Sequence, residues 1–235
     1  MILDSAEPKV VGSFGNAKSL SESRLEEVQG ACDLVEIRLD LLEAEGALTS
    51  GGRWSHLEGL PLLFTARRGD EGGAGNLDAA RRSALLEEVL EKATLIDIEL
   101  VSAGEMAGIL ERMKEAGMPW VASWHDFEGR ADSFDRIPAM AEQAAEAGAA
   151  CFKAAVRLHT AGDVARLAGL LEKPAPLPLS LMGMGALAPV SRLLCAQYGS
   201  MLNYGYIGDE PTAPGQWDAA LLKQAISQLA RIGGC

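Results

Sequence analysis

The chain has 235 residues, of which 48% are hydrophobic and 23% charged, and its formal net charge is −12. This length can bury the core of one large domain, so we expect a single domain over residues 1–235. The acidic balance argues against nucleic acid or an anionic membrane surface as a partner, although a local cationic pocket can still bind a small anion. No apolar run approaches the roughly 18 residues of a membrane span, and no signal-peptide pattern is present, so we expect a cytoplasmic protein.

Eight short apolar runs have the composition of buried parallel strands. In chain order they cover residues 9–14, 34–40, 62–67, 95–100, 120–125, 151–156, 178–182 and 201–204. Each run is followed by a helical pattern or by a segment long enough for one. This alternation predicts an α/β protein with a parallel sheet, and eight units predict a closed (β/α)8 TIM barrel. An open doubly wound sheet is the alternative, but it usually carries a glycine fingerprint after its first strand, which this chain lacks.

The helices between the strands are predicted from amphipathic periodicity and from capping residues. Their expected ranges are 21–30, 78–93, 103–116, 134–147, 160–171, 189–198 and 216–232. Ser21 and Asp78 are the expected N-caps of the first two, and Gly30 and Gly148 are expected helix stops. Residues 43–60 are poorly patterned, so we expect only a short helix or a loop there.

Lys153 is unusual because it lies in the middle of the apolar run over residues 151–156. Loss of water lowers the pKa of a lysine, and the neutral amine that results can attack a carbonyl group. For an isolated lysine, the favoured interpretation is an edge strand with the ammonium group in solvent. The rest of the chain favours a buried, reactive amine instead.

Cationic groups are predicted at the carboxyl ends of several strands, where (β/α)8 barrels carry their functional residues. Arg38 lies near the end of the second strand, Arg67 ends the third and His125 ends the fifth. Arg192 follows the seventh. Together they would bind a polar anion and lower the pKa of Lys153 further by like-charge repulsion. His125 is also a candidate proton shuttle because its unperturbed pKa is near neutrality, although a strand-end histidine taken alone is more often structural.

Charged residues alternate with apolar ones in two of the strands. Glu36 and Arg38 share one face of the second strand, and Asp97 and Glu99 share one face of the fourth. In the second strand this pattern is typical of a half-exposed antiparallel strand. In a barrel, the charges of the second strand would instead point inward at a site.

The sequence offers no pattern for a metal or a cofactor. The four cysteines, Cys32, Cys151, Cys195 and Cys235, show neither paired spacing nor clustering with histidine, which argues against structural zinc and a disulfide framework. The glycine-rich segment 68–75 has neither phosphate-binding nor dinucleotide-binding spacing. We expect it to make a sharp turn over a pocket.

Six motifs, in the same order and with similar gaps, resemble the type I 3-dehydroquinate dehydratase family of the shikimate pathway. They cover residues 35–40, 64–67 with 71–73, 123–127, 152–156, 181–185 with 191–192, and 213–216. The resemblance extends over nearly the whole chain. It implies a lyase that dehydrates 3-dehydroquinate to 3-dehydroshikimate in aromatic amino acid biosynthesis, without a cofactor, and that is often a homodimer.

The resemblance also implies a role for each site residue. Lys153 would form a Schiff base with the C3 ketone, His125 would act as general acid and base, and Glu71 would orient His125. Arg192 would pair with the substrate carboxylate. The remaining substrate-binding positions that it implies are Glu36, Arg38, Arg67, Met182, Met184, Thr212 and Gln216.

Within that set, the acidic and basic residues would hold the ring hydroxyls, and Thr212, at the family's serine position, would complete the carboxylate end with Gln216. The two methionines would form an apolar wall, for which ordinary barrel packing is an equally good explanation. Residues 212–216 would close as a lid. Two other functions stay open: a class I aldolase, which also uses a barrel lysine imine, and a barrel that binds a ligand without catalysis.

Overall fold

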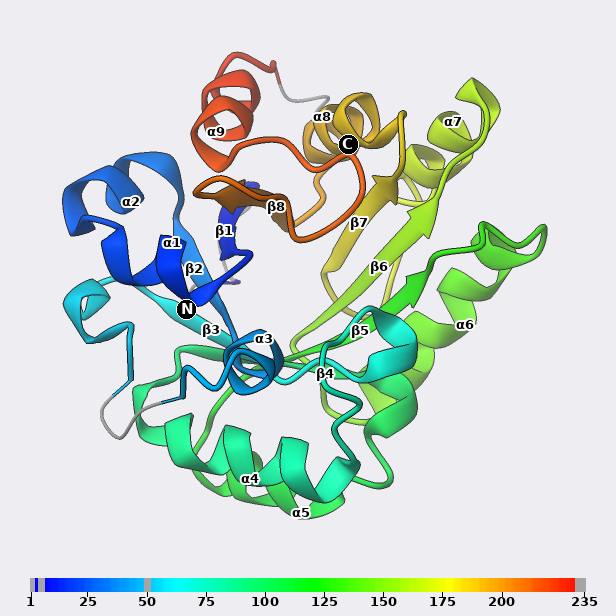
Figure 1. Ribbon diagram of the computed structural model, residues 1–235. Coiled ribbons are helices and arrows are strands. Elements are labelled where there is room, and N and C mark those ends of the chain that lie inside the picture. Colours follow the sequence, from blue (N-terminus) through cyan, green and yellow to red (C-terminus); the bar gives the residue numbers. More distant parts are fainter. Residues whose placement is uncertain (1–2, 4–6, 49–51, 231–235) are drawn as a thin grey trace.

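The structure is a computed structural model that describes residues 3, 7–48 and 52–230. Within this part of the chain, eight parallel strands form a nearly closed barrel with helices around its outside (Figure 1). The strands are β1 (Lys9–Phe14), β2 (Leu34–Arg38), β3 (Leu62–Thr65), β4 (Leu95–Glu99), β5 (Trp120–Asp126), β6 (Cys151–Arg157), β7 (Leu179–Met184) and β8 (Leu202–Ile207). The (β/α)8 barrel predicted from the sequence is confirmed.

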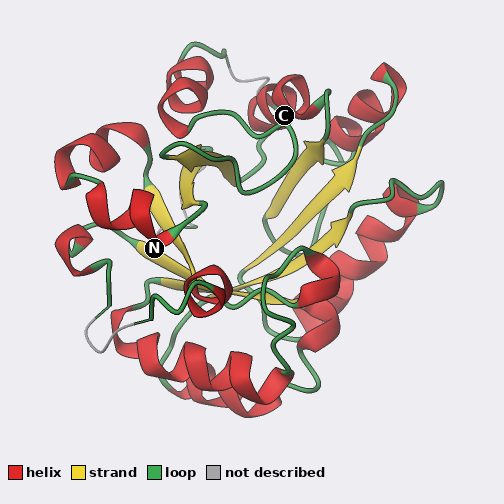
Figure 2. Ribbon diagram, in the orientation of Figure 1, coloured by secondary structure: helices red, strands yellow, loops and turns green. Residues whose placement is uncertain are grey.

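Strand pairing runs continuously from β7 through β6, β5, β4, β3, β2 and β1 to β8. Two hydrogen bonds bridge the remaining gap between β7 and β8. The amide of Met201 donates to the carbonyl of Leu179 over 2.8 Å, and the hydroxyl of Ser180 donates to the carbonyl of Leu202 over 2.5 Å. Figure 2 shows the strands as an inner ring and the helices as an outer layer.

The described helices cover the outside of this ring. They are α1 (Ala17–Glu22), α2 (Leu25–Ala31), α3 (Leu39–Ala44), α4 (Ala79–Val89), α5 (Ala107–Glu115), α6 (Ser133–Glu146), α7 (Ala161–Gly169), α8 (Ala188–Gln197) and α9 (Ala219–Ser227). Short 3-10 turns occur at η1 (Ser55–Leu57), η2 (Gly69–Glu71), η3 (Leu90–Lys92) and η4 (Leu100–Ser102). In this part of the chain, no helix has the length and apolarity that crossing a bilayer requires.

Apolar side chains form two separate cores, one on each face of the sheet. The core inside the barrel includes Val11, Leu34, Leu63, Leu95, Val121, Cys151 and Leu202. The larger core lies between the strands and the helices, and Phe64 and Phe152 belong to it. Because both faces of each strand are buried, the strands appear in the sequence as nearly continuous apolar runs.

The barrel interior becomes polar toward the carboxyl ends of the strands. Glu36, Thr65, Asp97, Ser123 and Lys153 are all buried there. β6 pairs with both β5 and β7, and Lys153 is only 4% exposed. These facts exclude the alternatives of a solvent-facing edge strand for Lys153 and of a half-exposed antiparallel strand for β2, which runs parallel to β1 and β3.

The single helix predicted over residues 21–30 is wrong, because the chain forms the two short helices α1 and α2 instead. Asn16 starts α1, since its side chain accepts a hydrogen bond from a free amide of the first turn. The hydroxyl of Ser21 donates to the carbonyl of Ala17, so Ser21 lies inside α1 and is not an N-cap. Gly30 lies within α2 and does not end a helix.

Other boundaries differ from the prediction for local reasons. β2 is shorter because Leu39 and Asp40 already belong to α3, and α5 starts later because η4 follows β4. α9 begins after Asp218, whose carboxylate caps it, and therefore not at Gln216. Residues 231–232 of the predicted last helix lie outside the described residues. β8, by contrast, extends three residues beyond its predicted end.

Two capping predictions are confirmed. The carboxylate of Asp78 accepts a hydrogen bond from the amide of Arg81 over 2.7 Å at the start of α4. Gly148 follows α6 with a φ of 80°, a left-handed conformation that favours glycine at a helix end.

Candidate active site

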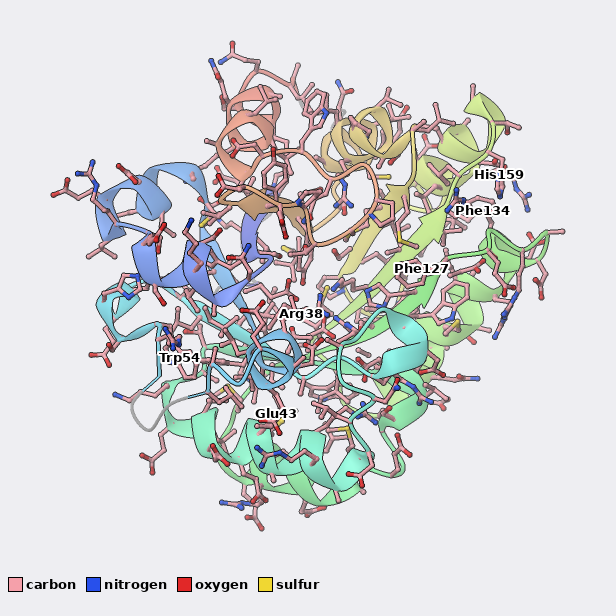
Figure 3. The ribbon with its side chains drawn as sticks, viewed as in Figure 1. Arg38, Glu43, Trp54, Phe127, Phe134 and His159 are labelled. Atoms are coloured by element: carbon pink, nitrogen blue, oxygen red, sulfur yellow. The ribbon has the colours of Figure 1, made fainter. Side chains whose placement is uncertain are left out.

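A pocket opens at the carboxyl ends of the strands and contains about 490 Å³ of space, counting the part open to solvent. It is lined by all the residues predicted as a site: Glu36, Arg38, Arg67, Glu71, His125, Lys153, Met182, Met184, Arg192, Thr212 and Gln216. Gly72, Phe127, Ala155, Tyr204 and Ala213 complete the lining. In Figure 3, Arg38 lies over the middle of the barrel, whereas Glu43 and Trp54 lie toward its rim. The fold thus brings together residues that are far apart in the sequence.

Lys153 lines this pocket and is almost fully buried. Its Nζ donates a hydrogen bond to Oδ2 of Asp97 over 2.9 Å and lies 4.1 Å from the ring centroid of Tyr204. Burial lowers the pKa of Lys153; Arg67 adds to this effect and Asp97 opposes it. Compared with a lysine in water, the amine gives up its proton more readily, although a carboxylate holds it in place.

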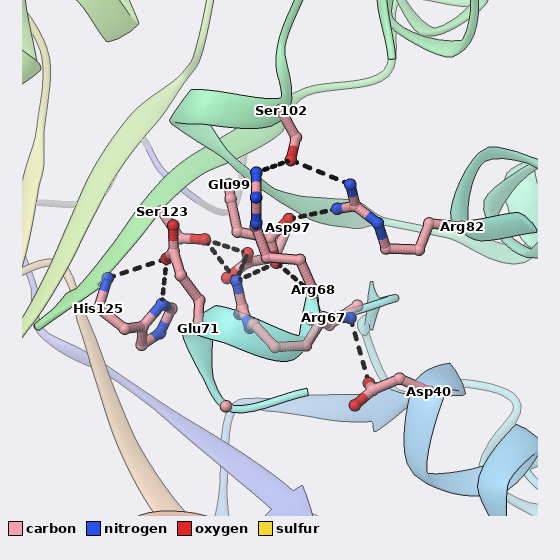
Figure 4. A network of polar contacts seen from close by, with 12 residues as sticks. Asp40, Arg67, Arg68, Glu71, Arg82, Asp97, Glu99, Ser102, Ser123 and His125 are labelled. Carbon is pink, nitrogen blue, oxygen red and sulfur yellow. Dashed lines mark hydrogen bonds and ion pairs between the residues drawn. The ribbon is translucent and has the colours of Figure 1, made fainter. Parts of the chain in front are cut away.

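Arg67 belongs to a buried network of charges with Asp97 and Glu99 (Figure 4), and Asp97 links this network to Lys153. Its Nη1 lies 2.9 Å from Oδ1 of Asp97 and 2.8 Å from Oε1 of Glu99, and it donates to Oγ of Ser123 over 2.6 Å. Burial alone would raise the pKa of Asp97, but Arg67 and Lys153 outweigh it and lower that pKa. Asp97 is therefore an anion shared between two buried cations.

His125 is held by Glu71 from two directions. Oε2 of Glu71 lies 2.9 Å from Nδ1 of His125. The same oxygen accepts a hydrogen bond from the backbone amide of His125 over 2.9 Å. Burial lowers the pKa of His125 well below its usual value, and Arg67 and Lys153 lower it further. Burial raises the pKa of Glu71 to about 8, against the opposing effect of Arg67. A neutral imidazole that donates from Nδ1 to Glu71 has a free lone pair on Nε2, which suits it to accept a proton.

The turn η2 places Glu71 for this contact. Gly72, the residue after the turn, has a φ of 87°, which favours glycine. A Cβ atom there would lie 2.7 Å from the ring of Phe127, and that ring stacks on His125 with centroids 6.4 Å apart. The glycine-rich segment therefore forms the sharp turn beside a pocket that the sequence predicts.

Arg192 is a buried cation without a carboxylate partner among the described residues. It is 1% exposed, and its Nη1 donates to the carbonyl of Tyr204 over 2.9 Å and lies 3.2 Å from Sδ of Met182. Its Nε has no hydrogen-bond partner in the described part of the chain. Burial lowers the pKa of Arg192 to about 10. A buried guanidinium in this state is suited to an anion that the chain itself does not supply.

The other predicted cations of the pocket are neutralised, which corrects one expectation. Arg38 forms a bidentate pair with Asp40, at 2.9 Å and 2.7 Å, and donates to the carbonyl of Gly72. Since Arg67 is paired as well, the predicted repulsion at Lys153 comes from Arg67 and is opposed by Asp97. The sequence-based interpretation left out this counter-charge.

Glu36 and the residues of the predicted lid also have specific contacts. The carboxylate of Glu36 accepts hydrogen bonds from Ser13 over 2.5 Å and from Thr65 over 2.9 Å. In the predicted lid, Oε1 of Gln216 accepts hydrogen bonds from the amide of Thr212 over 2.9 Å and from the hydroxyl of the same residue over 2.8 Å. Residues 212–216 are thus tied together over the pocket.

Within the described residues, no group of three or more His, Cys, Asp or Glu side chains is arranged to hold a metal ion. Cys32, Cys151 and Cys195 are free and buried, and Cys235 lies outside the described residues. The polar groups of the pocket are therefore those already described: an amine, an imidazole, carboxylates and guanidinium groups.

Residues 15–232 match the family model of type I 3-dehydroquinase. The chain belongs to the type I 3-dehydroquinase family. The predicted family is confirmed, and so is the enzyme class, since the members of this family are hydro-lyases that dehydrate 3-dehydroquinate.

Similar proteins within the family cover most of the chain. A 3-dehydroquinate dehydratase of Methanothrix thermoacetophila is 34% identical over 222 residues, which are 94% of this chain and 92% of that protein. A catabolic 3-dehydroquinate dehydratase of Acinetobacter baylyi is 29% identical over 92% of this chain and 81% of that protein.

Solved structures agree with these matches. The 3-dehydroquinate dehydratase of Geobacillus kaustophilus superposes with a TM-score of 0.81 at 26% identity, over 94% of this chain and 90% of that one. The Enterococcus faecalis structure gives a TM-score of 0.79 at 26% identity, over 97% and 96% of the two chains.

Three residues that contact the site were not among the predicted site residues. Asp97 and Ser123 lie beneath the pocket beside Lys153 and Arg67, and Tyr204 covers the nitrogen of Lys153. The sequence shows that Asp97 alternates with apolar residues on β4. In a closed barrel, the charged face of this strand points inward, so Asp97 was detectable in principle. For Tyr204 the sequence leaves the role open, since an aromatic residue in an apolar strand is typical of core packing.

Proposed function

We propose that this chain dehydrates 3-dehydroquinate to 3-dehydroshikimate, a step of the shikimate pathway, through an imine on Lys153. The observation that carries the proposal is that one pocket contains a buried lysine of lowered pKa, a neutral histidine and an arginine without a counter-ion. An amine, a base and an anion site are what a keto acid needs for this reaction.

Imine formation begins when the lone pair of Nζ on Lys153 attacks the C3 ketone. The new N–C bond forms as the π electrons move to oxygen, which takes up a proton and gives a carbinolamine. Loss of that oxygen as water leaves a protonated imine. Asp97 holds the amine in position before the attack and offsets the positive charge afterward.

Elimination then uses His125. Its Nε2 lone pair removes the C2 proton, and the electrons of the C–H bond flow toward the iminium and give an enamine. The enamine electrons form the C1–C2 double bond as the C1 hydroxyl leaves with the proton that His125 returns. Water hydrolyses the imine, which releases the product and restores Lys153. The contact with Glu71 keeps Nε2 free for both transfers.

Substrate binding is assigned to the remaining pocket residues. The carboxylate would pair with Arg192, with Thr212 and Gln216 of the lid beside it. Glu36, Arg38 and Arg67 are placed to hold ring hydroxyls. Met182 and Met184 would form the apolar wall, and no metal or other cofactor enters the reaction.

Borohydride reduction tests the proposal directly, because it converts an imine into a stable secondary amine. Protein incubated with 3-dehydroquinate and borohydride should gain a mass adduct on the peptide that contains Lys153. Lys153→Met should not gain it, whereas the control Lys173→Met, on the exposed surface, should behave as the unchanged protein. An adduct confined to other lysines, or none at all, would refute the imine.

The same assay separates the two alternatives. An aldolase would form the adduct with a sugar phosphate and cleave it, but would not convert 3-dehydroquinate. A non-catalytic binder would bind the keto acid and form no adduct. The homodimer and the cytoplasmic location stay predictions, and sedimentation equilibrium would test the first of them.

A further inference from the structure

Tyr204 projects from β8 into the barrel and places its ring against the nitrogen of Lys153 on β6. The nitrogen lies 4.1 Å from the ring centroid, well inside the roughly 6 Å within which a cation and an aromatic face attract each other. Both side chains are buried. Attraction of this kind is strongest when water is excluded from the pair.

The hydroxyl of Tyr204 does not account for this placement. It is buried without a hydrogen-bond partner in the described part of the chain. Burial raises the pKa of Tyr204 well above its usual value, and Asp97 and Glu36 raise it further, so the phenol stays neutral. The ring therefore faces the nitrogen with its ordinary negative π surface and without a formal charge.

The number of hydrogens on the nitrogen of Lys153 changes during the proposed reaction. As a result, hydrogen bonding alone does not stabilise the charge equally at every stage. A lysine ammonium carries three N–H donors, whereas the protonated imine carries one. Asp97 accepts a hydrogen bond from this nitrogen over 2.9 Å and can occupy that one donor. The π face needs no particular hydrogen, because it interacts with the charge itself.

We propose that the ring face of Tyr204 stabilises the iminium form of Lys153 during the reaction. The inference rests on the proposed function, since it needs an imine at Lys153. The carbinolamine and the enamine are neutral at this nitrogen, so the ring favours the iminium over the species on either side of it. Asp97 and the ring of Tyr204 then both stabilise the positive charge of the iminium.

The test varies the charge on the ring face and keeps its shape. Tyr204→Phe removes the hydroxyl and retains the ring, and mono-, di- and trifluorinated phenylalanine at the same position weaken the π face in steps. For each protein, the fraction of Lys153 trapped by borohydride at saturating substrate is measured by mass spectrometry. The ratio of kcat to KM is recorded in parallel.

Tyr204→Phe should keep the trapped fraction close to that of the unchanged protein. Across the fluorinated series the trapped fraction should fall in steps, by roughly tenfold in total, because weakening a desolvated cation–π contact lowers the population of iminium. The matched control places the same fluorinated residues at Phe152, which packs in the core outside the barrel, and there the trapped fraction should not change.

Equal trapping throughout the series would overturn the role of the ring, because a packing residue responds to shape and not to fluorination. This outcome differs from failure of the proposed function, in which the unchanged protein itself forms no adduct. A large loss already in Tyr204→Phe would also overturn the inference, since it would assign the effect to the hydroxyl.

Discussion

The two ends of the pocket handle buried charge in opposite ways. Around Lys153, each buried cation forms an ion pair. Asp97 pairs with both Lys153 and Arg67, and Glu99 pairs with Arg67. At the other end Arg192 is equally buried, yet no carboxylate among the described residues pairs with it. A buried charge with a partner has its desolvation cost offset, whereas an unpaired buried charge destabilises the empty protein until an anion arrives. The first end is thus organised for chemistry and the second for recognition.

The largest expected effect is at the paired end. Lys153→Met should remove turnover, with a loss of more than roughly 10⁴-fold in kcat, because no other amine is placed to form the imine. Absorbance of 3-dehydroshikimate measures the rate. The exposed Lys173→Met serves as the control, and turnover of Lys153→Met near that of the control would rule out the covalent route.

His125→Ala should be less severe, because it removes a proton transfer and not the nucleophile. We expect kcat to fall by roughly 10²- to 10⁴-fold, the usual contribution of a general acid or base. The imine should still form, so borohydride should still label Lys153 in this variant. If labelling were lost together with turnover, His125 would be required for imine formation instead.

Matched changes at two arginines test the contrast itself. Arg67→Met removes the positive charge that pairs with the buried carboxylates of Asp97 and Glu99. It should therefore lower the free energy of unfolding by about 3–5 kcal/mol. Arg192→Met removes an unpaired buried charge and should leave that free energy unchanged or raise it. Urea denaturation at neutral pH measures both variants, and equal losses in the two would contradict the contrast.

Arg192→Met should instead weaken substrate binding. We expect KM to rise roughly 10- to 100-fold, as removal of charge-assisted hydrogen bonds predicts, with a smaller change in kcat. If substrate affinity were unchanged, the carboxylate would bind elsewhere in the pocket.

The smallest effect concerns the pH dependence of stability. Burial raises the pKa of Glu71 to about 8, whereas a glutamate in an unfolded chain titrates near about 4.3. The folded state therefore holds this proton more tightly, so the contribution of Glu71 to stability is complete below the unfolded pKa and is lost as pH rises toward about 8. Glu71→Gln should remove this loss, at most a few kcal/mol. Urea midpoints of both proteins over this range measure it, and parallel curves would contradict the raised pKa.

Much of the fold was predictable because barrel strands have both faces buried. Continuous apolar runs such as residues 151–156 mark β6 without any knowledge of its neighbours. Short helices were less predictable. The division into α1 and α2 depends on single side-chain hydrogen bonds, such as that of Ser23 with the carbonyl of Leu20, which periodicity does not record.

By itself, the sequence determined the order of strands and helices, the family and the residue types available for chemistry. These follow from local apolar patterns and from motif spacing, which depend only on residues close together along the chain. Only the tertiary structure decided which charges meet. Asp97 and Lys153 are 56 positions apart and become partners because alternate residues of β4 and β6 point to the barrel axis. Whether a buried cation is neutralised, as at Arg67, or left open for a ligand, as at Arg192, depends on distances of a few ångströms between strands, and these exist only in the closed barrel.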